Sequence, residues 1–214
     1  MPLSSQEAEF FVSVILHAGK DTDMLDRAVS SVLQQTFADW ELLVFGDGSV
    51  DGIREDMRPW TRQDRRIRVM DFVTDSRIGE PRNAVMSQAR GEFVTHLDAG
   101  DEYYPDYIEQ VARCRDKTDV LVFGYDVVYQ DGAMVERAAK RGPRAGGNVF
   151  SMNPIAPLGV SHRRAIVERV GGFNNLLWQH EDSDLWQRLE RAEVRLVFIP
   201  LKSGRHYVSL ARAD

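Results

Sequence analysis

The chain has 214 residues and a formal net charge of −6, with 43% apolar and 28% charged residues. The acidic balance argues against the phosphate backbone of nucleic acids as the main ligand, and the apolar fraction excludes a disordered chain. The single cysteine, Cys114, excludes an internal disulfide framework and a zinc site built from several cysteines.

The first half of the chain alternates short apolar runs with helical patterns. Apolar runs predict strands over residues 10–16, 40–45, 67–73 and 92–97. Helices are predicted over the amphipathic segment 25–33, after the turn at 46–52, and from Pro81 to about Arg90. This alternation is typical of βαβ units, so we expect an α/β fold with a mostly parallel sheet and helices on both faces.

The second half has a different pattern, although no repeat or shift in composition divides the chain. A helix is expected to begin near Pro105, and residues 120–129 are predicted to form a strand that ends in a hairpin turn at Gln130-Asp131-Gly132. Further elements are predicted as helices over 163–170 and 181–191 and a last strand over 195–199.

Two turns rich in aspartate follow predicted parallel strands, at the sheet edge where such folds bind ligands. Asp47 fits either an Asx turn or a carboxylate that accepts hydrogen bonds from a nucleobase. Asp98 and Asp101 fit either a solvated acidic turn or a site for Mg²⁺ or Mn²⁺, since these cations prefer oxygen ligands.

The predicted helix over 181–191 carries a further candidate. Asp182 shares a helix face with Leu185, Trp186 and Leu189, whereas Asp184 points with Arg188 as an ordinary i,i+4 pair. Asp182 either projects from the core into a cleft, where burial raises its pKa and favours a role as a base, or stabilises the helix dipole.

Weaker signals come from isolated basic residues and from the cysteine. Arg77, Arg82 and Asn83 lie upstream of the fourth strand, where they face a diphosphate or are ordinary surface residues. His206 alone indicates little, and Cys114 lies on a predicted helix as a packing residue.

Taken together, these motifs resemble family 2 glycosyltransferases, which are inverting enzymes that use nucleotide sugars and have the GT-A fold. The resemblance runs from Val12 to about Ser209. It rests on the segments Val12-Ser13-Val14-Ile15, residues 28–41, Gly46-Asp47-Gly48-Ser49, Pro81-Arg82-Asn83, residues 89–93, Leu97-Asp98-Ala99-Gly100-Asp101, Val170-Gly171-Gly172-Phe173, Glu181-Asp182 with Asp184-Leu185-Trp186, and Arg205-His206, in the order of the family.

The resemblance implies roles for individual residues. It implies donor nucleotide binding by Asp47, Arg77 and Asp98, with Asp47 at the base. It also implies that Asp182 is the general base. The implied cation, Mn²⁺ or Mg²⁺, would be held by Asp98, Asp101 and His206, and the acceptor side would include Glu181 and Trp178.

Three positions depart from the family pattern. Where the family has an aromatic-Asn pair just after the first strand, this chain has His17-Ala18-Gly19-Lys20, and Gly46 replaces the first aspartate of the second motif. Gly100 stands where the family usually has its direct metal ligand. We therefore expect weakened cation binding, with Asp101 or His206 as substitutes for the missing ligand.

The implied function is transfer of a sugar from a nucleoside diphosphate sugar to a hydroxyl acceptor with inversion. The expected organisation is a single GT-A domain over residues 1–214, with a nucleotide-binding half (1–101) and an acceptor-binding and catalytic half (102–214). A non-catalytic domain that binds sugar nucleotides or a protein partner is the alternative, and a nucleotidyltransferase is a weaker one.

The expected partners are a nucleotide-sugar donor and a glycan, lipid-linked or other hydroxyl acceptor, with no nucleic acid. A homodimer is left open. The sequence contains no run of 18 uninterrupted apolar residues and no secretory signal pattern at its start. We therefore expect a cytoplasmic location and no transmembrane segment, with a peripheral membrane association left open.

Overall fold

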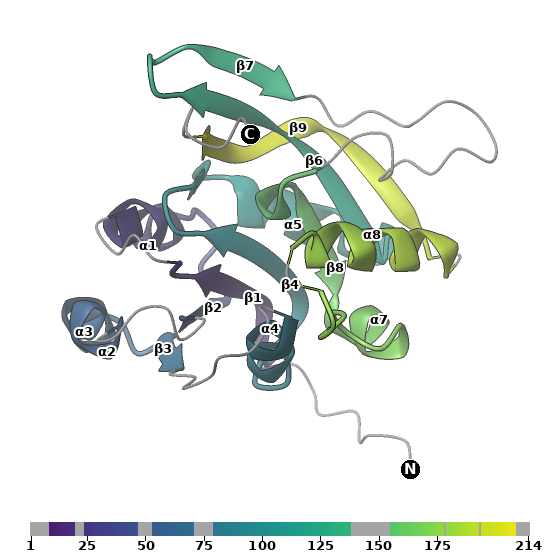
Figure 1. Cartoon of the computed structure of the whole chain (residues 1–214), viewed down its shortest axis with the longest axis horizontal. Coiled ribbons are helices and arrows are strands. Elements are labelled where there is room, and N and C mark those ends of the chain that lie inside the picture. The colour runs from purple at the N-terminus through teal and green to yellow at the C-terminus, as the bar shows by residue number, and fades with distance from the viewer. Residues whose placement is uncertain are drawn as a thin grey trace.

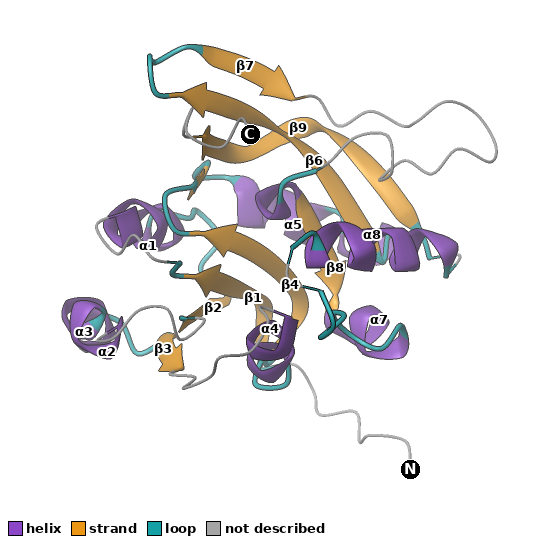
Figure 2. Ribbon diagram, in the orientation of Figure 1, coloured by secondary structure: helices purple, strands orange, loops and turns teal. Residues whose placement is uncertain are grey.

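The structure, a computed structural model, describes residues 9–19, 24–46, 53–70, 79–137, 155–177, 179–192 and 194–208. The described residues form one sheet of nine strands with helices on both faces (Figures 1 and 2). This arrangement confirms the expected α/β fold. Among the described helices, none combines the length and the apolar character that crossing a membrane requires.

The described elements follow the order that the sequence predicts, with several short additions. The strands are β1 (Phe10–His17), β2 (Trp40–Phe45), β3 (Ile67–Met70), β4 (Gly91–Asp98), β5 (Glu102–Tyr103), β6 (Val120–Tyr129), β7 (Met134–Arg137), β8 (Val160–Arg163) and β9 (Leu196–Val208). The helices are α1 (Leu25–Leu33), α2 (Ile53–Asp56), α3 (Arg58–Gln63), α4 (Gly79–Met86), α5 (Tyr107–Arg113), α7 (Arg164–Arg169) and α8 (Glu181–Arg191).

The strand order across the sheet is β3-β2-β1-β4-β8-β6-β9-β5, and β7 pairs with β6 as a hairpin. The four strands from β3 to β4 are parallel, whereas β8 is antiparallel to β4 and β5 is antiparallel to β9. The carboxyl ends of β1, β2 and β4 therefore meet at one edge, the edge where α/β sheets bind ligands.

Two apolar cores lie on opposite faces of the sheet because strand side chains alternate between the faces. Val12, Val14 and Leu16 of β1 pack in the core that includes α1 and α5. Ile15 points to the other core, which α4, α7 and α8 cover. In Figure 2 the two sets of helices lie on the two sides of the orange sheet.

The second core contains a fully buried pair of imidazoles. His96 of β4 and His162 of β8 lie with their Nε2 atoms 3.0 Å apart. The rings of Phe173 and Trp186 pack against His96, with centroids 5.5 and 5.8 Å away. Burial lowers the pKa of both histidines, to about 4 for His162.

Two predicted boundaries are wrong. The helix that begins near Pro81 ends at Met86 and not near Arg90. Tight turns follow it, and the Arg90 backbone N–H donates to Glu41 Oε1 at 2.6 Å, so this residue is already held beside β4. The last strand continues from Leu196 to Val208 and is much longer than the predicted 195–199.

Candidate functional site

The site begins where β1, β2 and β4 end together. In the ladder, His17 is aligned with Phe45 of β2 and with Asp98 of β4. The His17 ring packs on the Phe45 ring, with a centroid distance of 5.1 Å, and its Nδ1 lies 3.6 Å from Asp98 Oδ1. The last residues of three strands thus place an imidazole beside the candidate diphosphate motif.

Arg82 joins this edge of the sheet to helix α8. Its Nη2 lies 3.3 Å from Asp98 Oδ1, and its Nε lies 3.2 Å from Glu181 Oε1. The Arg82 side chain is only 3% exposed, whereas that of Asp98 is 34% exposed. A guanidinium buried between two carboxylates fixes their separation, so Arg82 ties the end of β4 to the start of α8.

The surroundings of Asp98 favour its ionised form. Desolvation raises its pKa, but the contact with His17 and the charges of Arg82, His17 and His206 outweigh that effect. The net pKa of Asp98 is well below its ordinary value. At neutral pH Asp98 is therefore an anion that can accept hydrogen bonds or face a cation.

Asp101 and His206 form a second pair at the other end of the same turn. His206 Nδ1 lies 2.9 Å from Asp101 Oδ2, and the Tyr207 backbone N–H donates to Asp101 Oδ1 at 3.0 Å. Burial raises the pKa of Asp101 more than the bond from His206 lowers it. Burial lowers the pKa of His206, but the hydrogen bond to Asp101 and its negative charge raise this pKa by more, so the net shift is upward.

Gly100 separates these two aspartates and adopts a left-handed backbone conformation. Its φ is +98°, a value that L side chains rarely adopt, and a Cβ there would lie 3.0 Å from Met24 Sδ. Arg27 Nη1 of α1 donates to the Gly100 carbonyl at 2.9 Å. The turn is therefore shaped for glycine, and a carboxylate does not fit here without strain.

The described residues do not form a preformed cation site. Both oxygens of Asp101 are engaged by His206 and Tyr207, and Asp98 is paired with Arg82. Within the described ranges, no group of three or more His, Cys, Asp or Glu side chains is placed to hold a metal ion. Asp98, Asp101 and His206 are thus not a complete set of ligands for a cation by themselves.

Helix α8 carries the candidate base. Glu181 is buried with Leu185, Trp186 and Leu189, whereas Asp182 is half-buried beside that face and accepts the Ser183 backbone N–H at 2.7 Å. Burial raises the pKa of Asp182, and the negative charges of Glu181 and Asp98 raise it further; Ser183 and Arg82 only partly oppose this. Asp184 pairs with Arg188 at 2.8 Å, as the helical spacing predicts.

Asn83 holds the chain that leads into α8. Its Nδ2 donates to the Phe173 carbonyl at 2.8 Å, and its Oδ1 accepts the Phe173 N–H at 2.8 Å. A Cβ on Gly172 would lie 2.5 Å from Asn83 Oδ1, so glycine is required for this close approach. Asn83 therefore supports the site and does not face a diphosphate, in contrast to the sequence-based suggestion.

The structure brings five candidates together and leaves three outside the described residues. The ion pairs of Arg82 with Asp98 and Glu181 and the contact of Asp101 with His206 place these residues, and Asp182 next to Glu181, around one edge of the sheet. Asp47, Arg77 and Trp178 lie outside the described residues. The sequence alone assigns no site role to His17 and does not predict the Arg82–Glu181 pair. The position of His17 at a strand end is a signal for its role, whereas no sequence pattern indicates the pair.

Known proteins are similar to this chain in sequence and in fold. The chain is 30% identical over 128 residues to the putative teichuronic acid biosynthesis glycosyltransferase TuaG of Bacillus subtilis, a match that covers 59% of this chain and 51% of that protein. The chain thus spans about half the length of this relative.

Solved structures with low sequence identity confirm the GT-A type of fold. S. aureus TarS 1-349 in complex with UDP-GlcNAc matches with a TM-score of 0.77 and 21% identity, over 95% of this chain and 60% of that chain. The mannosyltransferase PcManGT of Pyrobaculum calidifontis, in complex with GDP-Man and Mn²⁺, matches with a TM-score of 0.69 and 16% identity, over 92% of this chain and 57% of that chain.

The family assignment rests on a separate match. The model of the family described as glycosyl transferase family 2 matches residues 13–166, which is more than half of the chain. The chain belongs to glycosyl transferase family 2.

Proposed function

We propose that this chain moves a sugar from a nucleoside diphosphate sugar to a hydroxyl group of an acceptor, with inversion at the anomeric carbon. The observation that carries the proposal is the buried Arg82, which links Asp98 to Glu181. This link holds Asp182 of α8 near the strand edge where α/β folds bind nucleotides.

The donor is proposed from the family and from the edge of the sheet. The complexes of TarS with UDP-GlcNAc and of PcManGT with GDP-Man support a nucleoside diphosphate sugar. Asp98 is the proposed contact at the diphosphate end, where Arg82 and His17 fix its carboxylate. Asp47 and Arg77 are proposed at the base and the nucleotide, as the family motifs imply.

Asp182 is the proposed general base. Its raised pKa makes the carboxylate a better proton acceptor. Asp182 takes the proton of the acceptor hydroxyl as that oxygen bonds to the anomeric carbon and the bond to the diphosphate oxygen breaks. Attack from the face opposite the leaving diphosphate inverts the configuration.

The acceptor is proposed to be a growing glycan, a class that agrees with the name of the TuaG relative. Trp178 is a proposed contact on the acceptor side. Because the Glu181 carboxylate is held by Arg82, we assign Glu181 a positioning role at the start of α8.

A cation, Mn²⁺ or Mg²⁺, is proposed only in the presence of bound donor. The protein ligands alone do not complete a site, and Mg²⁺-type sites commonly take further ligands from substrate phosphates. No step above depends on the cation.

A specific observation favours a second candidate, a non-catalytic domain that binds sugar nucleotides. The turn at Gly100 excludes the usual metal-binding carboxylate, since its φ is +98°. In this reading the family fold and donor binding persist without transfer.

Two isosteric variants separate the candidates. We expect Asp182→Asn to keep the fold and the donor affinity but to lower turnover by about 10²-fold or more, the contribution of a positioned base. Asp184→Asn is the matched control, because it alters only a partly exposed pair on the same helix turn.

Turnover is measured as transfer and as hydrolysis over a panel of nucleotide sugars, and donor affinity is measured by calorimetry. Equal losses in both variants would remove Asp182 from the mechanism. Donor binding by the unmodified protein, without transfer to any acceptor in a broad panel of glycans, would favour the non-catalytic domain.

A further inference from the structure

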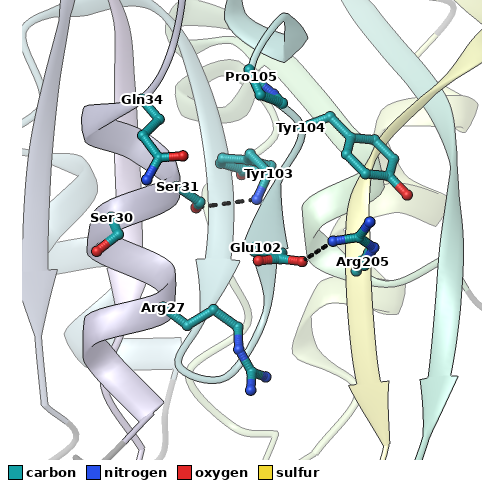
Figure 3. A pocket seen from close by; sticks show the side chains of 9 residues that line it. All are labelled: Arg27, Ser30, Ser31, Gln34, Glu102, Tyr103, Tyr104, Pro105 and Arg205. Carbon is teal, nitrogen blue, oxygen red and sulfur yellow. Dashed lines mark hydrogen bonds and ion pairs between the residues drawn. The ribbon is translucent and has the colours of Figure 1, made fainter. Parts of the chain in front are cut away.

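A polar pocket of about 320 Å³ lies between α1 and the β5–β9 ladder. Its walls are the exposed side of α1 with the following Gln34, residues 102–105, and Arg205 of β9. Figure 3 shows Arg27 and Ser30 on α1 and Gln34 just after it, with the Arg27 side chain extending toward the side of the helix where Glu102 and Arg205 pair. The volume is at the small end of the range for ligand pockets and suits one sugar unit.

This pocket lies behind the candidate catalytic turn. Glu102 is aligned with Arg205 in the β5–β9 ladder, whereas the preceding Asp101 contacts the following His206. Because successive residues of a strand point to opposite faces, Glu102 and Arg205 face away from the Asp101–His206 pair. A ligand in the pocket therefore does not occupy the proposed donor site.

The charge of the pocket favours an anion. Arg27 and Arg205 line it with only one carboxylate, Glu102, between them. Arg205 Nη1 pairs with Glu102 Oε1 at 2.5 Å, and Arg27 Nη1 donates to the Gly100 carbonyl. A guanidinium has five N–H donors. The bonds found among the described residues use only some of them, so both arginines keep donors for a carboxylate or phosphate.

Neighbouring groups suit the remainder of a sugar. The Ser30 hydroxyl and the Gln34 amide lie on the α1 wall and are types that bond sugar hydroxyls. The Tyr104 ring lines the opposite wall, and Arg205 lies over it at 5.2 Å from the centroid.

We propose that this pocket, lined by Arg27, Ser30, Gln34, Glu102, Tyr104 and Arg205, is a binding site for a hexose unit that carries an anionic group. The site is distinct from the proposed donor site and does not depend on transfer activity. Its contact with the Gly100 turn runs through Arg27, so its occupant would rest against the back of the candidate catalytic edge.

The test is a set of titrations of the full chain with glucuronate, glucose 6-phosphate, glucose, acetate and inorganic phosphate. Binding is followed by backbone amide NMR shifts. We expect the two anionic sugars to shift the amides of Ser30, Gln34, Glu102 and Arg205. Neutral glucose should bind at least about tenfold more weakly, because it lacks the charged hydrogen bonds.

Variants locate the site. Ser30→Trp fills the pocket and should abolish these shifts, and Arg205→Gln should weaken anionic sugars by about tenfold. Ser87→Trp is the control, since Ser87 is an exposed serine next to α4, on the other face of the sheet. UDP titrations of each variant monitor the proposed donor site separately.

Several outcomes would overturn the inference. The first is no shift of these amides with either anionic sugar. A second is equal binding of acetate or phosphate alone, which would mark a simple anion patch. A third is loss of binding in Ser87→Trp as in Ser30→Trp. Shifts centred on Asp98 and Glu181 would place the ligand in the donor site and also contradict it. Failure of UDP binding with intact sugar binding would count against the proposed function alone.

Discussion

The imidazoles of His96 and His162 face each other with their Nε2 atoms 3.0 Å apart, at full burial. One ring must donate and the other accept, so the contact requires at least one neutral ring. Burial lowers the pKa of both residues, and for His96 the neighbouring His162 and Arg82 lower it further. Both shifts favour the neutral form of the pair in the folded state.

This pair predicts a loss of stability in mild acid. The unfolded chain binds protons at histidine near pH 6.5, whereas folded His162 binds them only near pH 4. The free energy of unfolding should thus fall as the pH drops from about 6.5 to about 4, by about 2 kcal/mol at pH 5 from this group. Urea unfolding at pH 7.5 and pH 5 measures the loss, and His162→Gln should reduce it. An identical pH dependence in the variant would contradict the prediction.

A second prediction concerns the buried guanidinium of Arg82. Arg82→Met removes the ion pair of Glu181 and leaves Asp98 with His17 alone among the described residues, so it should lower the free energy of unfolding by about 3 kcal/mol. Adding Glu181→Gln to Arg82→Met should restore part of the loss, because one uncompensated charge is removed. Arg58→Met, which breaks an exposed pair with Glu55, should cost less than about 1 kcal/mol. Urea unfolding of the three variants measures these losses. A double variant that is less stable than Arg82→Met would contradict the arrangement.

A third prediction follows from the backbone of Gly100. Gly100→Asp restores the family carboxylate, but it forces a side chain into the left-handed region and against Met24. It should cost about 1–3 kcal/mol of stability and fail to tighten Mn²⁺ binding. Gly132→Asp is the matched control, because its φ is +82° but its Cβ would meet nothing within 4 Å. Thermal unfolding compares them; a Gly100→Asp protein that is fully stable and binds Mn²⁺ tightly would show that the turn accepts a ligand.

A fourth prediction concerns the dependence of the cation on nucleotide. Since the oxygens of Asp101 are already engaged, free protein should bind Mn²⁺ weakly, and UDP should strengthen binding by supplying phosphate oxygens. Electron paramagnetic resonance of Mn²⁺ with and without UDP measures this. Tight binding to the nucleotide-free protein would contradict it.

Strong periodic patterns predict most of the elements in this fold. The apolar run of β2, the amphipathic α1 and the hairpin after β6 have the predicted bounds, because burial and turn chemistry act over a few neighbouring residues. The sequence predicts a shorter β9 than the structure has, because Pro200 and Gly204 interrupt its apolar pattern. A register shift in the β6–β9 ladder accommodates this stretch, and Gly204 packs directly on the backbone of Glu102.

The site could be predicted only where its residues belong to local motifs. The positions of Asp98 at a strand end and of Asp182 at a helix start follow from periodicity. The link from Arg82 to Glu181 joins residues about a hundred positions apart, and pairing of this kind depends on tertiary packing. The sequence predicts Asp182 on the buried side of α8, but Glu181 lies deeper, because Arg82 neutralises its charge there.

The antiparallel pairing of β5 with β9 has a consequence for synthesis of the chain. The Asp101 carboxylate has its hydrogen bonds only when His206 and Tyr207 contact it, and these residues are synthesised more than a hundred positions later. The first four parallel strands can associate as soon as they leave the ribosome, since their contacts are already available. The turn from Asp98 to Asp101 therefore gains these contacts only after the first four parallel strands have been made. A nascent chain that stops before residue 205 lacks His206 and Tyr207, so it cannot complete the contacts of Asp101.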